Sequence, residues 1–230
     1  MTKATPRSAW YRQIVHSLMQ HMWHKAVGTT LFIAVFFGAY LFLLKHPTYT
    51  TTVMPFTGLD DLIDFQPLAM PLYLSLWVYV SLPPALLSTR RELFNYASAM
   101  AINCSIGLFI FYFWPTSVPA AQIDWVQYPG MNSLKSLDAA GNACPSLHVA
   151  TAVFSALWFN FVLRRFEAPS WVSGLNWAWC IGIIYSTLAI RQHVVIDVIA
   201  GLILGTSIAY LSLRHHELVT ARPLNMAKPL

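Results

Sequence analysis

The sequence predicts an all-α integral membrane protein, a six-helix bundle with an amphipathic N-terminal segment at the membrane interface. Of the 230 residues, 57% are hydrophobic and only 10% are charged, whereas a soluble domain has about 25% charged residues. Apolar runs recur along the chain, each close to the roughly 20 residues with which a helix crosses a bilayer. Basic residues are scattered over the short loops between these runs, which is typical of membrane topology and excludes a clustered nucleic-acid-binding face.

Residues 1–26 are expected to form a cytoplasmic lead-in along the membrane surface. Apolar side chains recur there at helical spacing, and basic and histidine side chains lie between them, as in a helix of the headgroup layer. The apolar set is Tyr11, Ile14, Val15, Leu18, Met19 and Met22. An ordinary basic segment leading into the first span is an equally good interpretation. The spacing of His16, His21 and His24 suits no standard metal site.

Residues 27–214 are expected to form a six-span membrane domain, and residues 215–230 a cytoplasmic tail. The predicted spans are residues 27–44, 68–87, 96–114, 148–163, 171–190 and 194–213. In the second span, Pro71, Pro83 and Pro84 predict a kink or an irregular end, because proline lacks an N–H donor. Two connecting loops are long, and the one rich in Pro, Gly, Ser and Asn, residues 115–147, is expected to fold back on the bundle.

The distribution of charge predicts that both termini are cytoplasmic. On one side of the predicted membrane lie Lys3, Arg7, Arg12, Lys25, Arg90, Arg91, Arg164, Arg165, Arg214, Arg222 and Lys228. The loops on the other side carry Lys45, Lys135 and Arg191 together with Asp60, Asp61, Asp64, Asp124 and Asp138. The loops that follow the first, third and fifth spans are therefore expected to face outward.

Two histidine-containing segments lie at the outward ends of the later spans. Residues 143–149 read Ala-Cys-Pro-Ser-Leu-His-Val, and Pro and Ser are residues that begin helices. A helix N-terminus there would present N–H groups and a positive dipole to a phosphate. The second segment holds His193 and Asp197, which at a spacing of four are expected to share one face of a helix. Asp197 is the only acidic residue within the predicted spans.

These residues suit phosphoryl transfer through a phosphohistidine. A carboxylate at Asp197 could accept the Nδ1–H of His193 and leave Nε2 available as a nucleophile or base. A second imidazole, His148, could protonate the leaving oxygen. Ser146, the backbone at the start of the fourth span and Arg191 are candidate donors to the phosphate oxygens.

The same residues resemble the motifs of the type 2 phosphatidic acid phosphatase superfamily. Pro145-Ser146-Leu147-His148 is similar to that family's Pro-Ser-Gly-His motif, and Ser186, His193 and Asp197 match its Ser-Arg-x5-His-x3-Asp motif with Thr187 in the place of Arg. The resemblance covers roughly residues 96–213. Ser186-Thr187 with Gln192-His193 is more similar to the branch that includes inositol phosphorylceramide synthases and related bacterial proteins.

The resemblance implies roles for individual residues and a location in the cell. It implies His193 as nucleophile, Asp197 as its orienting partner, His148 as general acid, and Ser146 and Ser186 at the phosphate. It also implies a lipid phosphate or pyrophosphate substrate, no cofactor and no metal, and an outward-facing site in a bacterial inner membrane. The family's first motif, with a lysine and an arginine, has no match at residues 113–121, so Arg191 or Lys135 would have to replace these cations.

Three alternatives remain open at this point. The hydrolase shares every named residue with a phosphotransferase that moves a head-group phosphate from a phospholipid to an alcohol acceptor. A zinc site could be formed from Cys144, His148, His193 and Asp197. A non-enzymatic transporter would need polar residues lining several spans at mid-depth, and spans one, four and six offer almost none besides Asp197, Ser and Thr.

Overall fold

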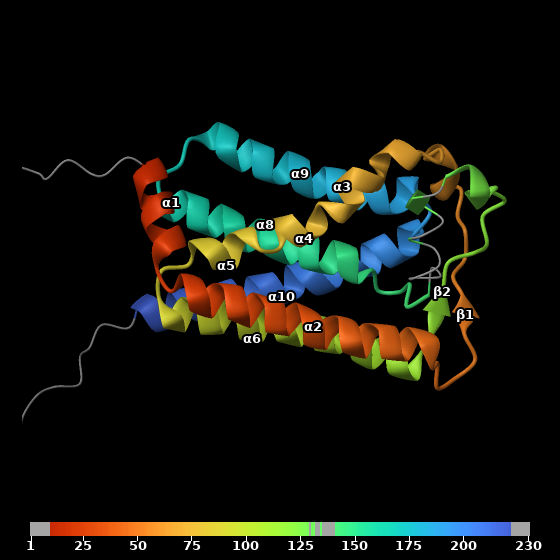
Figure 1. The fold of residues 1–230 in the computed structure, drawn as a ribbon, viewed down its shortest axis with the longest axis horizontal. Helices are drawn as coiled ribbons and strands as arrows, with labels where there is room; N and C mark the ends of the chain where they lie inside the picture. The colour runs from red at the N-terminus through yellow and green to blue at the C-terminus, as the bar shows by residue number, and fades with distance from the viewer. Residues whose placement is uncertain (1–9, 129, 132–133, 135–140, 222–230) are drawn as a thin grey trace, which may run out of the picture.

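The computed structural model is 74% helical and confirms the predicted all-α membrane fold (Figure 1). It describes residues 10–128, 130–131, 134 and 141–221, and Lys135 of the predicted phosphate site lies outside these residues. Within the described residues, six helical segments are long and apolar enough to cross a membrane. The positions of these segments match the six predicted spans to within a few residues.

The helices run back and forth between two ends of the bundle. They are α1 (Trp10–Met19), α2 (Met22–Lys45), α3 (Met70–Leu74), α4 (Leu76–Tyr79), α5 (Leu82–Leu86), α6 (Arg90–Phe113), α8 (Leu147–Arg165), α9 (Ser170–Ala189) and α10 (Val195–Ala221). Short 3-10 turns lie at Asp60–Leu62, Pro67–Ala69 and Trp125–Gln127. We call the end where α8 and α10 begin the site end, at the right of Figure 1, and the end that carries α1 the basal end.

Two short strands that sequence patterning did not reveal join the long loops at the site end. Strand β1 (Thr52–Val53) pairs in parallel with β2 (Thr116–Ser117), with Thr52 opposite Thr116. Each strand has only two residues, too few for an alternating pattern to be recognised. The pairing fixes the loop after α2 against the loop after α6.

The second span is broken into α3, α4 and α5, as its prolines predict. Pro84 has no N–H to donate to the carbonyl of Val80, and the Tyr96 hydroxyl donates to that oxygen instead at 3.2 Å. Side chains that take over such backbone groups are what make broken helices tolerable in a membrane protein. The Nζ of Lys25 likewise donates to the carbonyl of Ala85 at 2.7 Å.

Helix α6 begins at Arg90, six residues before the predicted span, because a capping box stabilises its first turn. The Thr89 hydroxyl accepts from the Glu92 N–H at 3.2 Å, and the Glu92 carboxylate accepts from the N–H groups of Ser88 and Thr89, each at 3.3 Å. Glu92 precedes the predicted third span, but it lies in the first turn of the observed helix α6.

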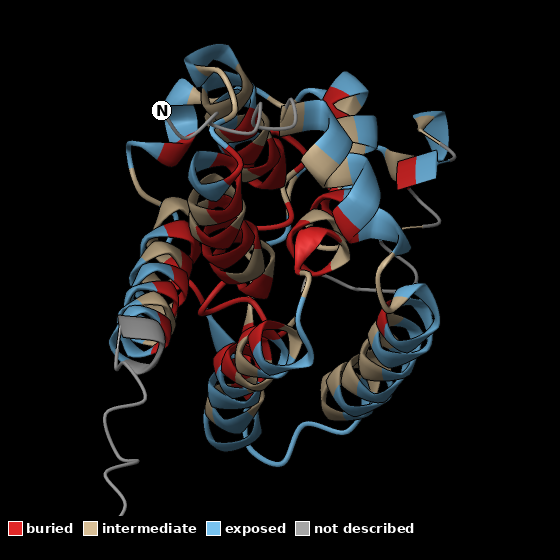
Figure 2. Cartoon of the chain, turned by 90° about the vertical axis from the view of Figure 1, so that its left-hand side faces the viewer, coloured by how far each residue is buried: buried red, intermediate tan, exposed pale blue. Residues whose placement is uncertain are grey.

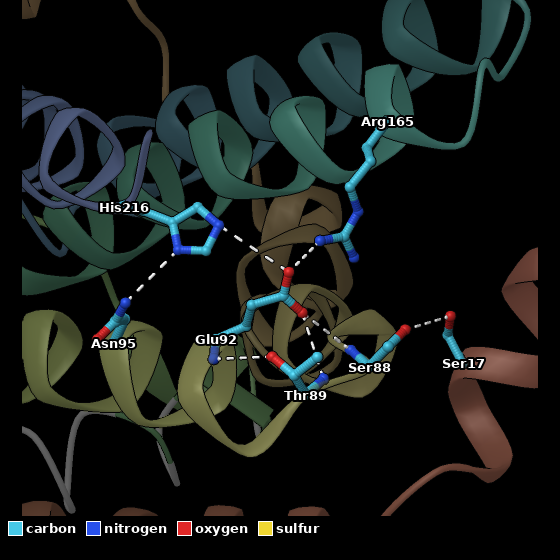
Figure 3. A network of polar contacts seen from close by, with 7 residues as sticks. All are labelled: Ser17, Ser88, Thr89, Glu92, Asn95, Arg165 and His216. Atoms are coloured by element: carbon cyan, nitrogen blue, oxygen red, sulfur yellow. Dashed lines mark hydrogen bonds and ion pairs between the residues drawn. The ribbon is translucent and has the colours of Figure 1, made fainter. Parts of the chain in front are cut away.

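Glu92 is the centre of a polar network at the basal end, shown in Figure 3. Its carboxylate pairs with the guanidinium of Arg165, and the Nε2 of His216 lies 3.9 Å from the same oxygen. These contacts join α6 to α8 and to the last turns of α10. Ser17 of α1 adds a hydrogen bond of 2.9 Å to Ser88. Helices α1, α6, α8 and α10 and the loop before α6 therefore meet at this end.

Helix α1 presents an apolar face that the protein leaves uncovered. Tyr11, Val15, Leu18 and Met19 lie on one side of the helix and are each more than 40% exposed. On the other side, Trp10 and Ile14 pack against the bundle. An uncovered apolar face of this kind is typical of helices that lie in the plane of a membrane surface, one of the two interpretations that the sequence allows.

Helix α8 is the core of the bundle, and α10 packs most extensively against it. In Figure 2 the buried residues gather on the central helices, whereas the outer helices are mostly intermediate or exposed. Two glycines let the backbones of α8 and α10 approach closely. A Cβ added at Gly201 or Gly205 would collide with the carbonyl oxygen of Ser146 or Ala150. The spacing Gly-x-x-x-Gly is typical of such close helix contacts in membranes.

We therefore expect Gly205→Ala to destabilise the protein by roughly 1–3 kcal/mol, because the methyl group meets backbone that cannot rotate away. Gly174→Ala is the matched control, since a Cβ at this helical position meets nothing within 4 Å. The better helix propensity of alanine should leave that variant as stable as the wild type or more so. Unfolding titrations with SDS in mixed micelles would measure both. Equal stability of the two variants would contradict the close contact.

Candidate active site

The Pro-Ser-Leu-His segment begins helix α8, as the sequence predicts. Ser146 is completely buried at the N-cap, and its hydroxyl accepts from the Val149 N–H at 3.3 Å. The N–H of Ser146 itself donates to the carbonyl of Asp197 at 3.0 Å. This bond joins the first turn of α8 directly to the first turn of α10. His148 is the second residue of α8 and therefore lies at the positive end of the helix dipole.

The loop before α8 is held by β2. The Cys144 N–H donates to the Thr116 hydroxyl at 2.8 Å, and the Ala143 N–H donates to the Thr116 carbonyl at 3.3 Å. Ala143, Cys144 and Val194 are buried together in one cluster. The β2 segment, the loop before α8 and the turn before α10 therefore pack together next to the start of α8.

His193 lies in the tight turn between α9 and α10. The expectation that His193 and Asp197 share one helix is wrong, because α10 begins at Val195. The carbonyl of Thr187 accepts from the N–H groups of both Gln192 and His193, at 3.0 and 3.1 Å. Arg191 adopts a left-handed conformation with φ of 56°, which reverses the chain direction at this point.

Asp197 nevertheless lies behind His193, as the spacing suggests. The Oδ2 of Asp197 is 3.6 Å from the Nδ1 of His193 and accepts from the Val194 N–H at 3.0 Å. A distance of 3.6 Å exceeds that of a hydrogen bond, and Nδ1 has no hydrogen-bond partner among the described residues. Catalytic hydrogen bonds are often long without substrate and shorten in the complex. The carboxylate is completely buried.

The structure brings His148 close to His193. Their ring centroids are 6.2 Å apart. The ring of Tyr73 stacks on His148 at 4.1 Å, and Trp77 meets it edge-on at 5.7 Å. The Nε2 of His148 is buried and has no hydrogen-bond partner among the described residues. Aromatic packing thus fixes the ring plane and leaves one nitrogen available to a bound molecule.

Arg191 is attached to the loop that precedes α3. Its guanidinium donates to the carbonyls of Asp60 and Ile63, at 3.2 and 2.9 Å, and lies 5.4 Å from the ring centroid of Phe56. The described contacts therefore give Arg191 a role in holding this loop. A role in binding phosphate remains a prediction.

Ser186 is the other predicted phosphate contact, and it lies inside α9. Its hydroxyl donates to the carbonyl of Ile183 at 2.6 Å, and the side chain is completely buried. Its carbonyl accepts from the N–H of Ile190 at the end of the helix. These contacts support the last turn of α9, from which the turn to His193 begins.

Sequence reasoning missed two residues near the histidines. Asp60 is buried, and its Oδ1 accepts from the Val195 N–H at 2.8 Å, so it stabilises the start of α10 from a loop 135 residues earlier in the chain. Gln192 is buried beside His193, and neither polar atom of its amide has a hydrogen-bond partner among the described residues. Its position next to His193 was the available signal for Gln192, whereas nothing local to Asp60 predicts its long-range contact.

The alternative zinc site does not form in the described part of the chain. No group of three or more His, Cys, Asp or Glu side chains in these residues is arranged to hold a metal ion. Cys144 instead lies beside the Asp197 carboxylate. Burial and the nearby Asp197 carboxylate raise the pKa of the Cys144 thiol from 9.0 to about 11. The thiol therefore stays protonated at neutral pH.

A family model described as the PAP2 superfamily matches residues 91–220. The match covers more than half of the 230-residue chain and includes α8, α9 and α10 with both histidines. Helix α2 and the broken helix α3–α5 lie outside it. No curated protein and no solved structure matches the chain.

The raised pKa of Cys144 predicts a loss of stability at alkaline pH. The folded protein favours the protonated thiol of Cys144. Its contribution to the free energy of unfolding is therefore fully present below the pKa of the thiol in the unfolded chain, and it is lost as the pH rises from 9 toward 11. The melting temperatures of the wild type and of Cys144→Ala, plotted against pH, should therefore converge over this range, because the variant lacks the titrating group. Parallel curves across the whole range would contradict the assignment.

Proposed function

The chain belongs to the PAP2 superfamily, and on this premise we propose that it is a membrane lipid phosphatase that forms a phosphohistidine at His193. Members of the superfamily are phosphatases or phosphotransferases that act on phosphate substrates. The observation that carries the proposal is the distance of 6.2 Å between the ring centroids of His148 and His193, with Asp197 behind His193. The substrate is a lipid phosphate or pyrophosphate, since the site lies at one end of six membrane-length helices.

In the first step, the Nε2 of His193 attacks phosphorus in line with the leaving oxygen. The P–N bond forms as the P–O bond to the lipid breaks, and His148 gives its proton to the leaving oxygen. The negative charge of Asp197 stabilises the positive charge that develops on the His193 ring. A shortening of the 3.6 Å separation by several tenths of an ångström brings Nδ1–H into hydrogen-bond range.

In the second step, a water molecule replaces the lipid. The now neutral His148 takes a proton from the water, whose oxygen attacks phosphorus as the P–N bond breaks. Inorganic phosphate leaves, His148 is again protonated, and His193 returns to its starting form. Asp197 holds the same tautomer of His193 throughout, so that Nε2 faces the phosphate in both steps.

The charge of the phosphate has to be met without the cations of the family's first motif. We propose that the N–H groups of Leu147 and His148, the Ser146 hydroxyl and the amide of Gln192 donate to the phosphate oxygens. Gln192 is buried with both amide atoms unpartnered among the described residues, which suits a group that is satisfied by a ligand. Arg191 adds positive charge two residues before His193.

We propose that the site faces outward and that both chain ends are cytoplasmic, in a bacterial inner membrane. The described residues at the basal end include Arg90, Arg91, Arg164, Arg165 and Arg214. Those of the site-end loops include Asp60, Asp61, Asp64 and Asp124, with Lys45 and Arg191 as their basic residues. The positive-inside rule favours the basal end as cytoplasmic. Residues 1–26 and 215–230 would then flank the membrane domain on that side.

A phosphotransferase is the second candidate, because Thr187 stands where most of the family has an arginine. This feature and the neighbouring Gln192 resemble the branch that includes inositol phosphorylceramide synthases. An alcohol would replace water in the second step, with the same residues in the same roles. Incubation of the purified protein with lipid phosphates and phospholipids decides between the two, since hydrolysis releases inorganic phosphate and transfer yields a new phospholipid.

The roles of the two histidines predict different responses to the leaving group. His148→Ala should lower kcat/KM on a lipid phosphate by about 10²–10⁴-fold. This ratio reports formation of the phosphohistidine and is independent of its hydrolysis, in which His148 acts as the base. The same substitution should cost far less on an aryl phosphate, whose leaving oxygen needs no proton. His193→Ala should abolish turnover of both substrates. Steady-state kinetics with the two substrates would test this, and equal losses for His148→Ala on both would contradict its role as the acid.

Arg191 can be tested for phosphate binding apart from its role in the loop. If it binds phosphate, Arg191→Gln should raise KM about tenfold or more, the value of a charge-assisted hydrogen bond. Phe56→Ala is the control, since it removes the ring beneath the guanidinium and keeps the charge. Both variants should lower the melting temperature. An unchanged KM in Arg191→Gln would restrict the residue to the structural role.

A further inference from the structure

A long apolar cavity extends from the candidate active site through the bundle toward the basal end. It has a volume of about 600 Å³, within the range typical of ligand sites, and is lined by α2, the broken helix α3–α5, α6 and the first turns of α8. Apart from a few residues at its two ends, its walls are hydrocarbon and aromatic side chains. The PAP2 family match does not include α2 or α3–α5, which form much of these walls.

The cavity reaches the catalytic acid. His148 lines it together with Tyr73, Trp77 and Thr151. His193 does not line the cavity, but its ring centroid lies only 6.2 Å from that of His148, whose ring stacks on Tyr73. A molecule in the cavity can present a head group to both histidines.

The cavity is long enough to hold an extended lipid chain. The residues of α2 that line the cavity recur every three to four positions from His24 to Leu41. At 1.5 Å per residue, this part of the helix is about 25 Å long. The hydrocarbon core of a bilayer is about 30 Å thick. The opposite face of α2 is exposed, with Leu31 63% and Val35 65% accessible, so α2 separates the cavity from the surrounding bilayer.

Polar side chains line the basal end of the cavity. His24, Lys25 and Arg90 line this end. Lys25 is fixed there, since its Nζ donates to the carbonyl of Ser17 at 2.6 Å and to that of Ala85 at 2.7 Å. A hydrocarbon chain can extend along the apolar walls only as far as this polar end, so the cavity has a defined length.

We propose that the cavity binds the hydrocarbon chain of the lipid phosphate, with the phosphate at His148 and His193 and the chain end near Gly28. This inference rests on the proposed function. The bilayer is as apolar as the cavity, so the chain gains little by moving from one to the other. The cavity therefore selects among lipids by the length and shape of their chains, and it contributes specificity more than affinity.

Two glycines of α2 provide a matched test. A Cβ added at Gly28 or at Gly38 meets nothing within 4 Å, but only Gly28 is among the residues that line the cavity. Gly28→Phe should fill the distal part of the cavity without touching the histidines, and Gly38→Phe adds the same ring outside it. Purified variants would be assayed with dioleoyl and dioctanoyl phosphatidate in detergent micelles.

For Gly28→Phe, we expect kcat/KM on the long-chain phosphatidate to fall about tenfold or more, the factor that overpacking a filled site produces. On the short-chain phosphatidate it should stay within about twofold of the wild type, because that chain does not reach residue 28. Gly38→Phe should match the wild type on both. The proposal is overturned if the two variants show the same chain-length dependence.

A binding measurement separates this inference from the proposed function. Phosphatidate with a diazirine at the end of a long acyl chain would be photolysed with the wild type, with and without excess unlabelled phosphatidate. The cavity proposal is supported if the label appears at Gly28, Thr29 and Ala97 and excess lipid suppresses it. This holds even if no lipid phosphate is hydrolysed, an outcome that would refute only the proposed function. Suppressible labels confined to the exposed face, at Leu31 and Val35, would overturn the cavity proposal.

Discussion

The close contact between the first turns of α8 and α10 is the constraint on which the candidate site depends. The Ser146 N–H donates to the Asp197 carbonyl at 3.0 Å, and Gly201 and Gly205 leave no Cβ between the two backbones. In a membrane, where apolar surfaces gain little from association, such close packing is what holds helices together. His148 follows Ser146 by two residues and Asp197 is itself a partner in the contact. The distance between the proposed acid and the proposed nucleophile is therefore set by backbone geometry, and any residue that separates α8 from α10 separates the two histidines as well.

The loops at the site end then fix the turn that carries His193. Asp60 accepts from the Val195 N–H, and Arg191 holds the Asp60 segment through two carbonyls. Thr116 binds the backbone before α8 through Cys144. Segments separated by up to 135 residues thus converge on the start of α10. The polar network around Glu92 plays the corresponding part at the basal end, so polar contacts close both ends of a bundle whose interior is mostly apolar.

The sequence predicted the class of fold, and it drew attention to the residues that the structure brings together at the candidate site, because both depend on local patterns. Span-length apolar runs and the Pro-Ser-Leu-His and His-x3-Asp spacings are visible without tertiary information. The start of α6 was missed because the Thr89–Glu92 capping box extends the helix past its apolar run. His193 was assigned to a helix because a spacing of four cannot distinguish a helical turn from the tight turn that the Thr187 carbonyl holds. Asp60, β1–β2 and the cavity depend on contacts between distant segments, and no local pattern encodes them.

The central claim is that His193 carries the phosphoryl group between the two steps. The most direct measurement is peptide mass spectrometry of the purified protein after brief reaction with a lipid phosphate and an alkaline quench that preserves phosphohistidine. The account predicts a phosphate on His193 in the wild type and none on any residue of the Asp197-containing peptide in His193→Ala. A phosphate found on His148 instead, or full turnover by His193→Ala, would contradict it.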